Sequence, residues 1–133
     1  MLKVMKEQLK MVNDFHKSFR IKSISRIEEE GFLEQALLRY TLMREENEEY
    51  LEAAKNGSEI EIADALGDML YILCGTILNH GMESILEAVF SEIHRSNMSK
   101  LDIDGNPIYR EDGKVLKGLN YSAPQLEAIV LTK

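Results

Sequence analysis

Residues 45–68 have the sequence EENEEYLEAAKNGSEIEIADALGD, and this stretch decides the fold. Its acids form two clusters, Glu45-Glu46-x-x-Glu49 and Glu61-x-x-Asp64-x-x-x-Asp68. Asn56-Gly57 between the clusters is a helix stop, and Ser58-x-x-Glu61 matches a capping box. The pattern therefore predicts two antiparallel helices joined by a tight turn. In such a hairpin the carboxylates of the two clusters lie at similar heights.

The second cluster lies in a helix that is otherwise uncharged. Between Ile60 and Leu73 the only charged residues are Glu61, Asp64 and Asp68, so we expect the rest of this helix to be buried. Carboxylates packed beside apolar side chains have raised pKa values and destabilise the fold unless a cation offsets their charge. The pattern therefore favours a metal site, although helix capping explains Glu61 equally well.

The ligand chemistry indicates a hard cation. Carboxylate oxygens without Cys or a nearby His favour Mg²⁺, or Mn²⁺, over zinc. A ferritin-like di-iron bundle needs Glu-x-x-His on two helices, and His16, His80 and His94 do not follow a Glu at that spacing. A solvated charged face is the simpler explanation for Glu48 and Glu52.

Apolar residues at helical spacing extend the pattern in both directions. They predict an all-α fold, in which four helices form a bundle over about residues 1–100 and an irregular tail covers about 101–133. The first helix ends before Lys22-Ser23, and the others span about 32–55, 58–79 and 83–97. The tail has turn signals around Ile108-Tyr109 and a short last helix over 126–131. All 133 residues fit one domain.

Composition excludes several classes of function. The net charge of −7 argues against sequence-independent nucleic-acid binding and against a polybasic membrane protein. The apolar run from Met69 to Leu78 is too short to span a membrane, and the N-terminus lacks the apolar core of a signal peptide. The lone Cys74 fits a reducing compartment. We therefore expect a soluble, cytoplasmic protein.

The two acid clusters resemble a motif of the all-α nucleoside triphosphate pyrophosphohydrolases, the superfamily of MazG-like proteins, dimeric dUTPases and phosphoribosyl-ATP pyrophosphohydrolases. The family pattern is Glu-x-x-Glu followed after a gap by Glu-x-x-Asp, which corresponds here to Glu46-x-x-Glu49 and Glu61-x-x-Asp64. Asp68, in Leu66-Gly67-Asp68, is similar to the aspartate of a MazG-type Leu-Gly-Asp segment. Either aspartate can therefore be the family equivalent.

The resemblance implies Mg²⁺-dependent hydrolysis of a nucleoside triphosphate to the monophosphate and pyrophosphate. Deoxynucleotides or modified nucleotides are the expected substrates. The implied roles are metal ligation by Glu46, Glu49, Glu61, Asp64 and Asp68, and catalysis by Glu45 and Glu46, with Glu45 orienting or deprotonating the water. The alternatives are phosphoribosyl-ATP hydrolysis and a non-catalytic bundle that binds metal or nucleotide.

The chain after residue 94 supplies cations and amides for the substrate. His94-Arg95-Ser96-Asn97-Met98-Ser99-Lys100 resembles the Asn-x-x-Lys element of dimeric dUTPases. Substrate contacts are expected from Arg95, Asn97, Lys100, Lys114, Lys117, Asn120 and Tyr121. The last four of these form either a lid over the nucleotide or an ordinary polar loop. Phe15-His16 is either a base-stacking element or, more simply, a core aromatic beside a surface His.

The apolar faces of the predicted helices exceed what one short chain can cover. Met and Leu residues on the first, third and fourth helices suggest burial against a partner subunit. Members of the superfamily commonly form dimers or dimers of dimers, and we expect at least a homodimer.

Overall fold

A computed structural model describes residues 2–133, with side chains from residue 5 onward. Within those residues the fold is all-helical and has no β-strand, which confirms the predicted class. The helices are α1 (Leu2–Ser18), α2 (Phe32–Asn56), α3 (Glu59–Asn79), α4 (Leu86–Met98) and α5 (Glu127–Val130). They belong to two compact units, Met1–Glu83 and Ser84–Lys133. The prediction of one domain, with a boundary near residue 100 between the helical core and the tail, stays a prediction.

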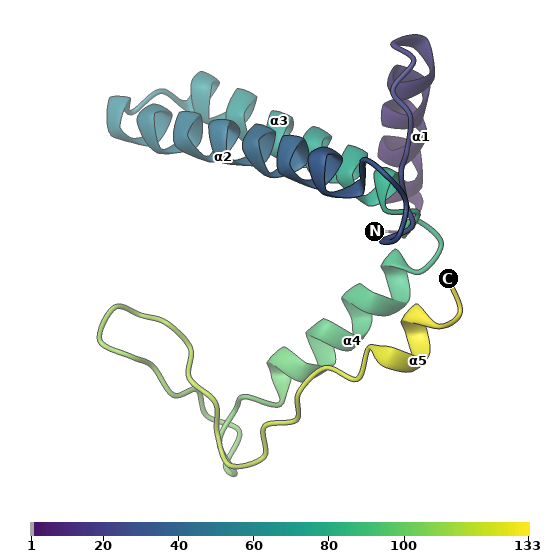
Figure 1. Cartoon of the computed structure of the whole chain (residues 1–133). Helices are drawn as coiled ribbons and strands as arrows, with labels where there is room; N and C mark the ends of the chain where they lie inside the picture. The colour runs from purple at the N-terminus through teal and green to yellow at the C-terminus, as the bar shows by residue number, and fades with distance from the viewer. Residues whose placement is uncertain (1) are drawn as a thin grey trace. The chain divides into compact units, whose positions relative to one another are not determined.

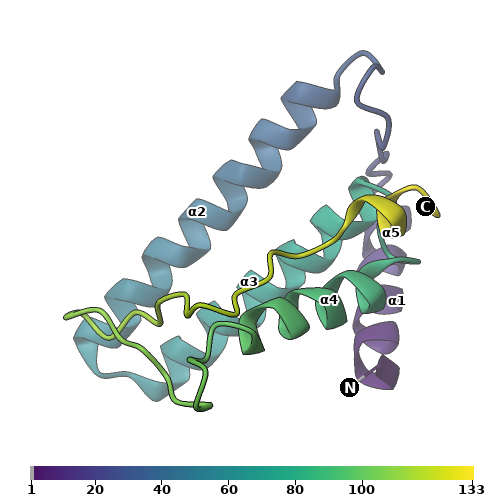
Figure 2. The same ribbon diagram turned by 90° about the horizontal axis from the view of Figure 1, so that it is seen from below.

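The first unit is built on the α2–α3 hairpin. The two helices lie side by side and run in opposite directions, and α1 crosses α3 (Figures 1 and 2). Ala53 of α2 and Ala65 of α3 are both buried, and side chains this small let the two backbones approach closely. Val12 of α1 and Cys74 of α3 are buried as well. The predicted hairpin is thus confirmed, and it fixes the acid clusters on neighbouring helices.

The first helix ends at Ser18, before Lys22-Ser23 as predicted. Arg20 adopts a left-handed conformation with φ of 57°. This conformation lets the Ile21 N–H donate to His16 O at 2.8 Å, which satisfies a carbonyl at the helix end. Glycine normally occupies such a position. Because the chain has an arginine there, the stop was not recognisable from the sequence.

The expectation that α3 is buried around its acids is wrong for the single chain. Ile60 is 85% exposed, and Leu66 and Leu73 are 51% and 45% exposed. The described residues of α3 that are buried are Ala65, Cys74, Gly75 and Asn79. None of the described helices combines the length and the apolar character needed to cross a membrane.

The second unit consists of α4 and the tail. Helix α4 starts at Leu86, three residues after the predicted start, and the tail runs back along it to α5 (Figures 1 and 2). An isolated antiparallel bridge pairs Tyr109 with Val115, in the segment where the sequence predicted turns. The short last helix is present at Glu127–Val130.

Candidate active site

The turn between α2 and α3 sets the register of the acid clusters. Gly57 ends α2 in a left-handed conformation, with φ of 66°, and its N–H donates to the Ala53 and Ala54 carbonyls. Ser58 then caps α3, because its hydroxyl accepts the Glu61 N–H at 3.2 Å. These two caps close the hairpin, so that residues 45–49 of α2 face residues 61–68 of α3 across a fixed turn.

Only half of the predicted capping box forms. The Ser58 N–H donates to Ala53 O at 3.2 Å, so it is not free for the side chain of Glu61. Glu61 lines a cavity beside the hairpin. Helix capping therefore does not explain why a glutamate is at position 61, because only the backbone of Glu61 takes part in the cap.

Three predicted metal ligands gather at one point. Carboxylate oxygens of Glu46, Glu49 and Asp68 all lie within 4.8 Å of one another. Glu46 is half-buried, whereas Glu49 is exposed. Oxygens this close repel one another when all three groups are ionised, unless a cation or a proton lies between them. We call these three residues the carboxylate triad.

The electrostatics of Glu46 reflect that crowding. Its Oε2 atom is buried and has no hydrogen-bond partner among the described residues. Burial, together with a hydrogen bond with Glu49 and the charges of Glu49, Asp68 and Asp64, raises the pKa of Glu46 to about 7. A buried acceptor without a donor is rare in folded proteins, and a bound cation is one way to satisfy it.

The remaining acids line a cavity of about 560 Å³ next to the triad. Glu45, Glu61 and Asp64 line it together with Glu49, which therefore belongs to both the cavity and the triad. Glu48 and Glu52 reach the same cavity, but they pair with Arg44 at 3.8 Å and Lys55 at 3.7 Å. The cavity is thus acidic along α2 and α3, and it adjoins a site with the chemistry of a metal centre.

His16 is placed differently from the prediction. It is 5% exposed, whereas Phe15 beside it is 38% exposed, so the expected core aromatic and surface histidine are reversed. Burial and the charge of Arg39 lower the pKa of His16, which keeps the ring neutral at pH 7. The neighbouring Phe15 meets Tyr71 edge to face, with ring centroids 5.6 Å apart.

Arg39 is buried, which the sequence analysis did not predict. It is 8% exposed, and its Nε and Nη2 donate to Thr76 Oγ1 at 3.1 Å and to Ile72 O at 2.9 Å. Both acceptors are uncharged, and among the described residues no carboxylate forms an ion pair with this guanidinium. The available signal was a single arginine within the apolar run Leu37-Leu38-Arg39-Tyr40.

The predicted substrate residues of the second unit have mixed surroundings. Lys117 Nζ lies 4.6 Å from the centroid of the Tyr121 ring, a cation–π contact. The Lys114 N–H donates to Asp112 Oδ1 at 3.2 Å, and Lys100 O accepts the Gly118 N–H at 2.9 Å. Arg95 pairs with Glu92, which raises the pKa of the guanidinium. Asn97 and Asn120 lie in the same unit.

Comparison with known proteins addresses the identity of the chain. No curated protein matches it. Its structure is similar to the crystal structure of a candidate NTP pyrophosphohydrolase from Exiguobacterium sp. 255-15, with 24% identity and a TM-score of 0.49 over 96% of this chain and 94% of that one. The model of the phosphoribosyl-ATP pyrophosphohydrolase family matches residues 12–97, which include both acid clusters. The chain therefore belongs to the phosphoribosyl-ATP pyrophosphohydrolase family, whose members are nucleotide pyrophosphohydrolases of the all-α, MazG-like superfamily.

Proposed function

We propose that the protein hydrolyses nucleoside triphosphates, such as deoxynucleotides or modified nucleotides, to monophosphate and pyrophosphate with Mg²⁺ as cofactor. The carboxylate triad carries this proposal. Three carboxylate oxygens within 4.8 Å form a site whose charge a divalent cation would balance, and the buried Oε2 atom of Glu46 has no donor among the described residues.

The chemistry of the donors fits Mg²⁺, with Mn²⁺ as the alternative. All three donors are hard carboxylate oxygens, which these ions prefer. Burial raises the pKa of the Cys74 thiol, so this residue stays protonated and is a poor ligand for a soft metal. Glu46, Glu49 and Asp68 would hold the ion, and Glu61 and Asp64 are the further ligands that we propose from the cavity side.

The positions of the chain's own residues support the roles that we propose for them. When bound, Mg²⁺ would neutralise charge on the phosphate oxygens and acidify an attacking water. Glu45 lines the cavity without belonging to the triad, which suits a residue that orients the water or accepts its proton. Because the pKa of Glu46 is raised to about 7, this carboxylate is partly protonated at neutral pH in the metal-free protein, and a bound cation would displace the proton.

We propose that residues of the second unit bind the substrate. Lys100, Lys114 and Lys117 supply positive charge, and Asn97, Asn120 and Tyr121 supply polar and aromatic contacts for the sugar and base. The contact between Lys117 and Tyr121 supports this proposal, because it holds an ammonium group beside a ring in one short segment.

Phosphoribosyl-ATP is the second candidate substrate, and the name of the matching family favours it. Like a nucleoside triphosphate, it carries a triphosphate on a ribose, so the same carboxylates suit both. A direct assay with phosphoribosyl-ATP beside the nucleotide panel separates the two substrates.

The test is pyrophosphate release with Mg²⁺ and a panel of canonical, deoxy and modified nucleoside triphosphates. We expect turnover by the natural protein and its loss in Glu49→Gln and Asp64→Asn. Glu34→Gln is the matched control, because Glu34 is an exposed glutamate of the same helix that lines neither the triad nor the cavity. If neither the panel nor phosphoribosyl-ATP is hydrolysed while metal still binds, the protein is a non-catalytic binder and the proposal is wrong.

A further inference from the structure

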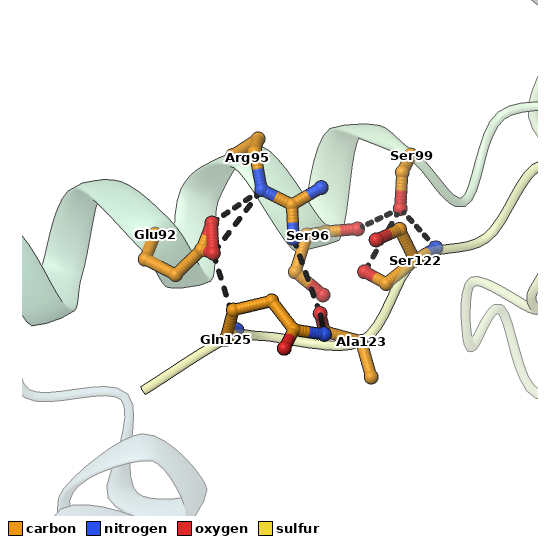
Figure 3. Close-up of polar contacts among 7 residues, drawn as sticks. All are labelled: Glu92, Arg95, Ser96, Ser99, Ser122, Ala123 and Gln125. Carbon is orange, nitrogen blue, oxygen red and sulfur yellow. Dashed lines mark hydrogen bonds and ion pairs between the residues drawn. The ribbon is translucent and has the colours of Figure 1, made fainter. Parts of the chain in front are cut away.

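The tail is fastened to one side of α4 by side chains spaced along the helix. Glu92, Arg95 and Ser99 contact the backbone of Gln125, Ala123 and Ser122, in that order (Figure 3). The three helix residues lie three and four positions apart, so they share one face. Because the order of their partners is reversed, the tail runs antiparallel to the helix. We call these contacts the tail clamp.

Glu92 and Arg95 form the centre of the tail clamp. The Glu92 side chain is only 14% exposed, and it accepts hydrogen bonds from Arg95 Nε and, at 3.1 Å, from the Gln125 N–H. Arg95 Nη2 donates to Ala123 O at 3.1 Å. The planar guanidinium can hold the carboxylate and the carbonyl together because its donors point in fixed directions. The ion pair therefore fixes two backbone positions of the tail.

The tail is also held at the end of α4. The Ser99 hydroxyl accepts the Ser122 N–H at 2.9 Å and directs its own proton to Ser96 O at 2.6 Å. The Gly118 N–H donates to Lys100 O at 2.9 Å. A Cβ atom at position 118 would lie 2.6 Å from Leu101 O, so the backbones approach at a distance that only glycine allows.

Two of the predicted substrate residues, Asn120 and Tyr121, lie between these fixed points. Asn120 and Tyr121 are enclosed by the contacts of Gly118 and Ser122, and Lys117 directly precedes Gly118. The Lys117 ammonium group contacts the Tyr121 ring across the same short segment. Because the backbone is held on both sides of Asn120 and Tyr121, these two residues lose less entropy on binding a ligand.

We propose that Glu92 and Arg95 are positioning residues, which hold the tail in register so that Lys117 and Tyr121 are presented to the nucleotide as a preformed pair. Arg95 therefore acts through the tail and not by contacting a phosphate. This inference rests on the proposed function for the role of Lys117 and Tyr121, but the tail clamp itself can be tested without a substrate.

The experiment compares Arg95→Ala, Arg95→Lys and Glu92→Gln with the natural protein in two measurements. The first is amide hydrogen exchange of Ser122 and Gln125 without ligand, which should accelerate about tenfold or more when the clamp is broken. The second is steady-state kinetics with the best nucleotide of the panel, for which we expect KM to rise roughly tenfold and kcat to change less than about twofold. Lysine keeps the charge but not the forked geometry, so Arg95→Lys should lie between the two extremes.

Two controls separate positioning from a general loss of stability. Arg26→Ala removes an arginine whose ion pair with Glu28 is largely exposed and holds no tail backbone, so it should leave both measurements unchanged. Lys117→Ala should raise KM by itself. Because Arg95 acts through Lys117, the double variant should raise KM by less than the product of the two single effects.

The outcomes are distinguishable. Faster exchange with unchanged KM would overturn the positioning role and leave the proposed function intact, and unchanged exchange in Arg95→Ala would overturn the tail clamp. If the natural protein hydrolyses nothing, binding of α,β-imido deoxynucleoside triphosphates with Mg²⁺ replaces KM. Weaker binding by the clamp variants would then support the inference although the proposed reaction has failed, and absent binding would overturn both.

Discussion

Asp68 and Asp64 differ in their relation to the carboxylate triad. An Asp68 oxygen lies within 4.8 Å of Glu46 and Glu49, whereas Asp64 lines the neighbouring cavity and affects Glu46 through its charge. We expect Asp68→Asn to weaken Mg²⁺ or Mn²⁺ binding by about 10- to 100-fold, and Asp64→Asn to weaken it by less. Calorimetric titration of each variant measures this, with Glu34→Gln as the control. A larger loss in Asp64→Asn would assign the principal ligand to the cavity instead.

Glu46 makes the stability of the metal-free protein depend on pH. Its pKa is about 7 in the folded chain, against 4.5 for an ordinary glutamate, so the folded state binds more protons between these values. Its contribution to the free energy of unfolding therefore falls as pH rises from about 5 to 7. Partial screening by water leads us to expect a loss of roughly 1 kcal/mol.

The measurement is urea unfolding at several pH values in EDTA, comparing the natural protein with Glu46→Gln. His16 acts in the opposite direction, because its lowered pKa destabilises the fold as pH falls below 6.5. The difference between the two proteins removes this common effect. If both proteins have the same pH dependence of unfolding, Glu46 is not the group that titrates. Saturating Mg²⁺ should abolish the difference in pH dependence between the two proteins, because the bound ion keeps the Glu46 carboxylate ionised.

Within helix α3, two glycines should respond oppositely to the same substitution. A Cβ atom on Gly75 would lie 2.5 Å from Arg39 Nη2 and 2.8 Å from His16 Nε2, both of which are on buried side chains. Gly75→Ala should therefore destabilise the fold by about 1–3 kcal/mol through overpacking, despite the better helix propensity of alanine. Gly67, which has no atom within 4 Å of its Cβ position, is the matched control.

We expect Gly67→Ala to stabilise the protein by up to about 1 kcal/mol, because its effect is limited to helix propensity. Chemical unfolding of both variants at one pH gives the two free energies. If Gly75→Ala were as stable as the natural protein, the Arg39 side chain would have moved away at little cost. The buried contacts of the guanidinium would then contribute little to stability.

The boundaries of the helices were predictable where the capping residues are close together in the sequence. Asn56-Gly57-Ser58 contains both caps of the hairpin, and it placed the end of α2 and the start of α3 within one residue. The exact end residue of α1 was not predictable, because Arg20 takes a conformation typical of glycine. The gathering of His16, Arg39 and Gly75 depends on where α1 crosses α3, and no spacing within one helix encodes that crossing.

At the scale of the whole molecule, the hairpin exposes apolar stripes that are typical of a protein interface. Leu66, Leu70 and Leu73 recur at helical spacing on α3 and are at least 40% exposed, and α2 carries a similar stripe at Leu33, Leu37 and Tyr40. Stripes of this kind on a monomer usually mark an interface. We propose that a second copy of the chain covers them, giving a homodimer or a dimer of dimers, as in other helical bundles.

Analytical ultracentrifugation at micromolar concentration should therefore give at least twice the mass of one chain. Leu66→Glu with Leu70→Glu should shift the protein to the monomer, because each change would bury an unpaired carboxylate in the interface. Ile27→Glu is the control, since Ile27 is 77% exposed but lies outside both stripes. A natural protein that sediments as a monomer would contradict the proposal, and an unchanged mass for the double variant would place the interface elsewhere. The stripes would then need another partner, because exposing leucine side chains to water costs about 25 cal/mol of free energy per Å² of apolar surface.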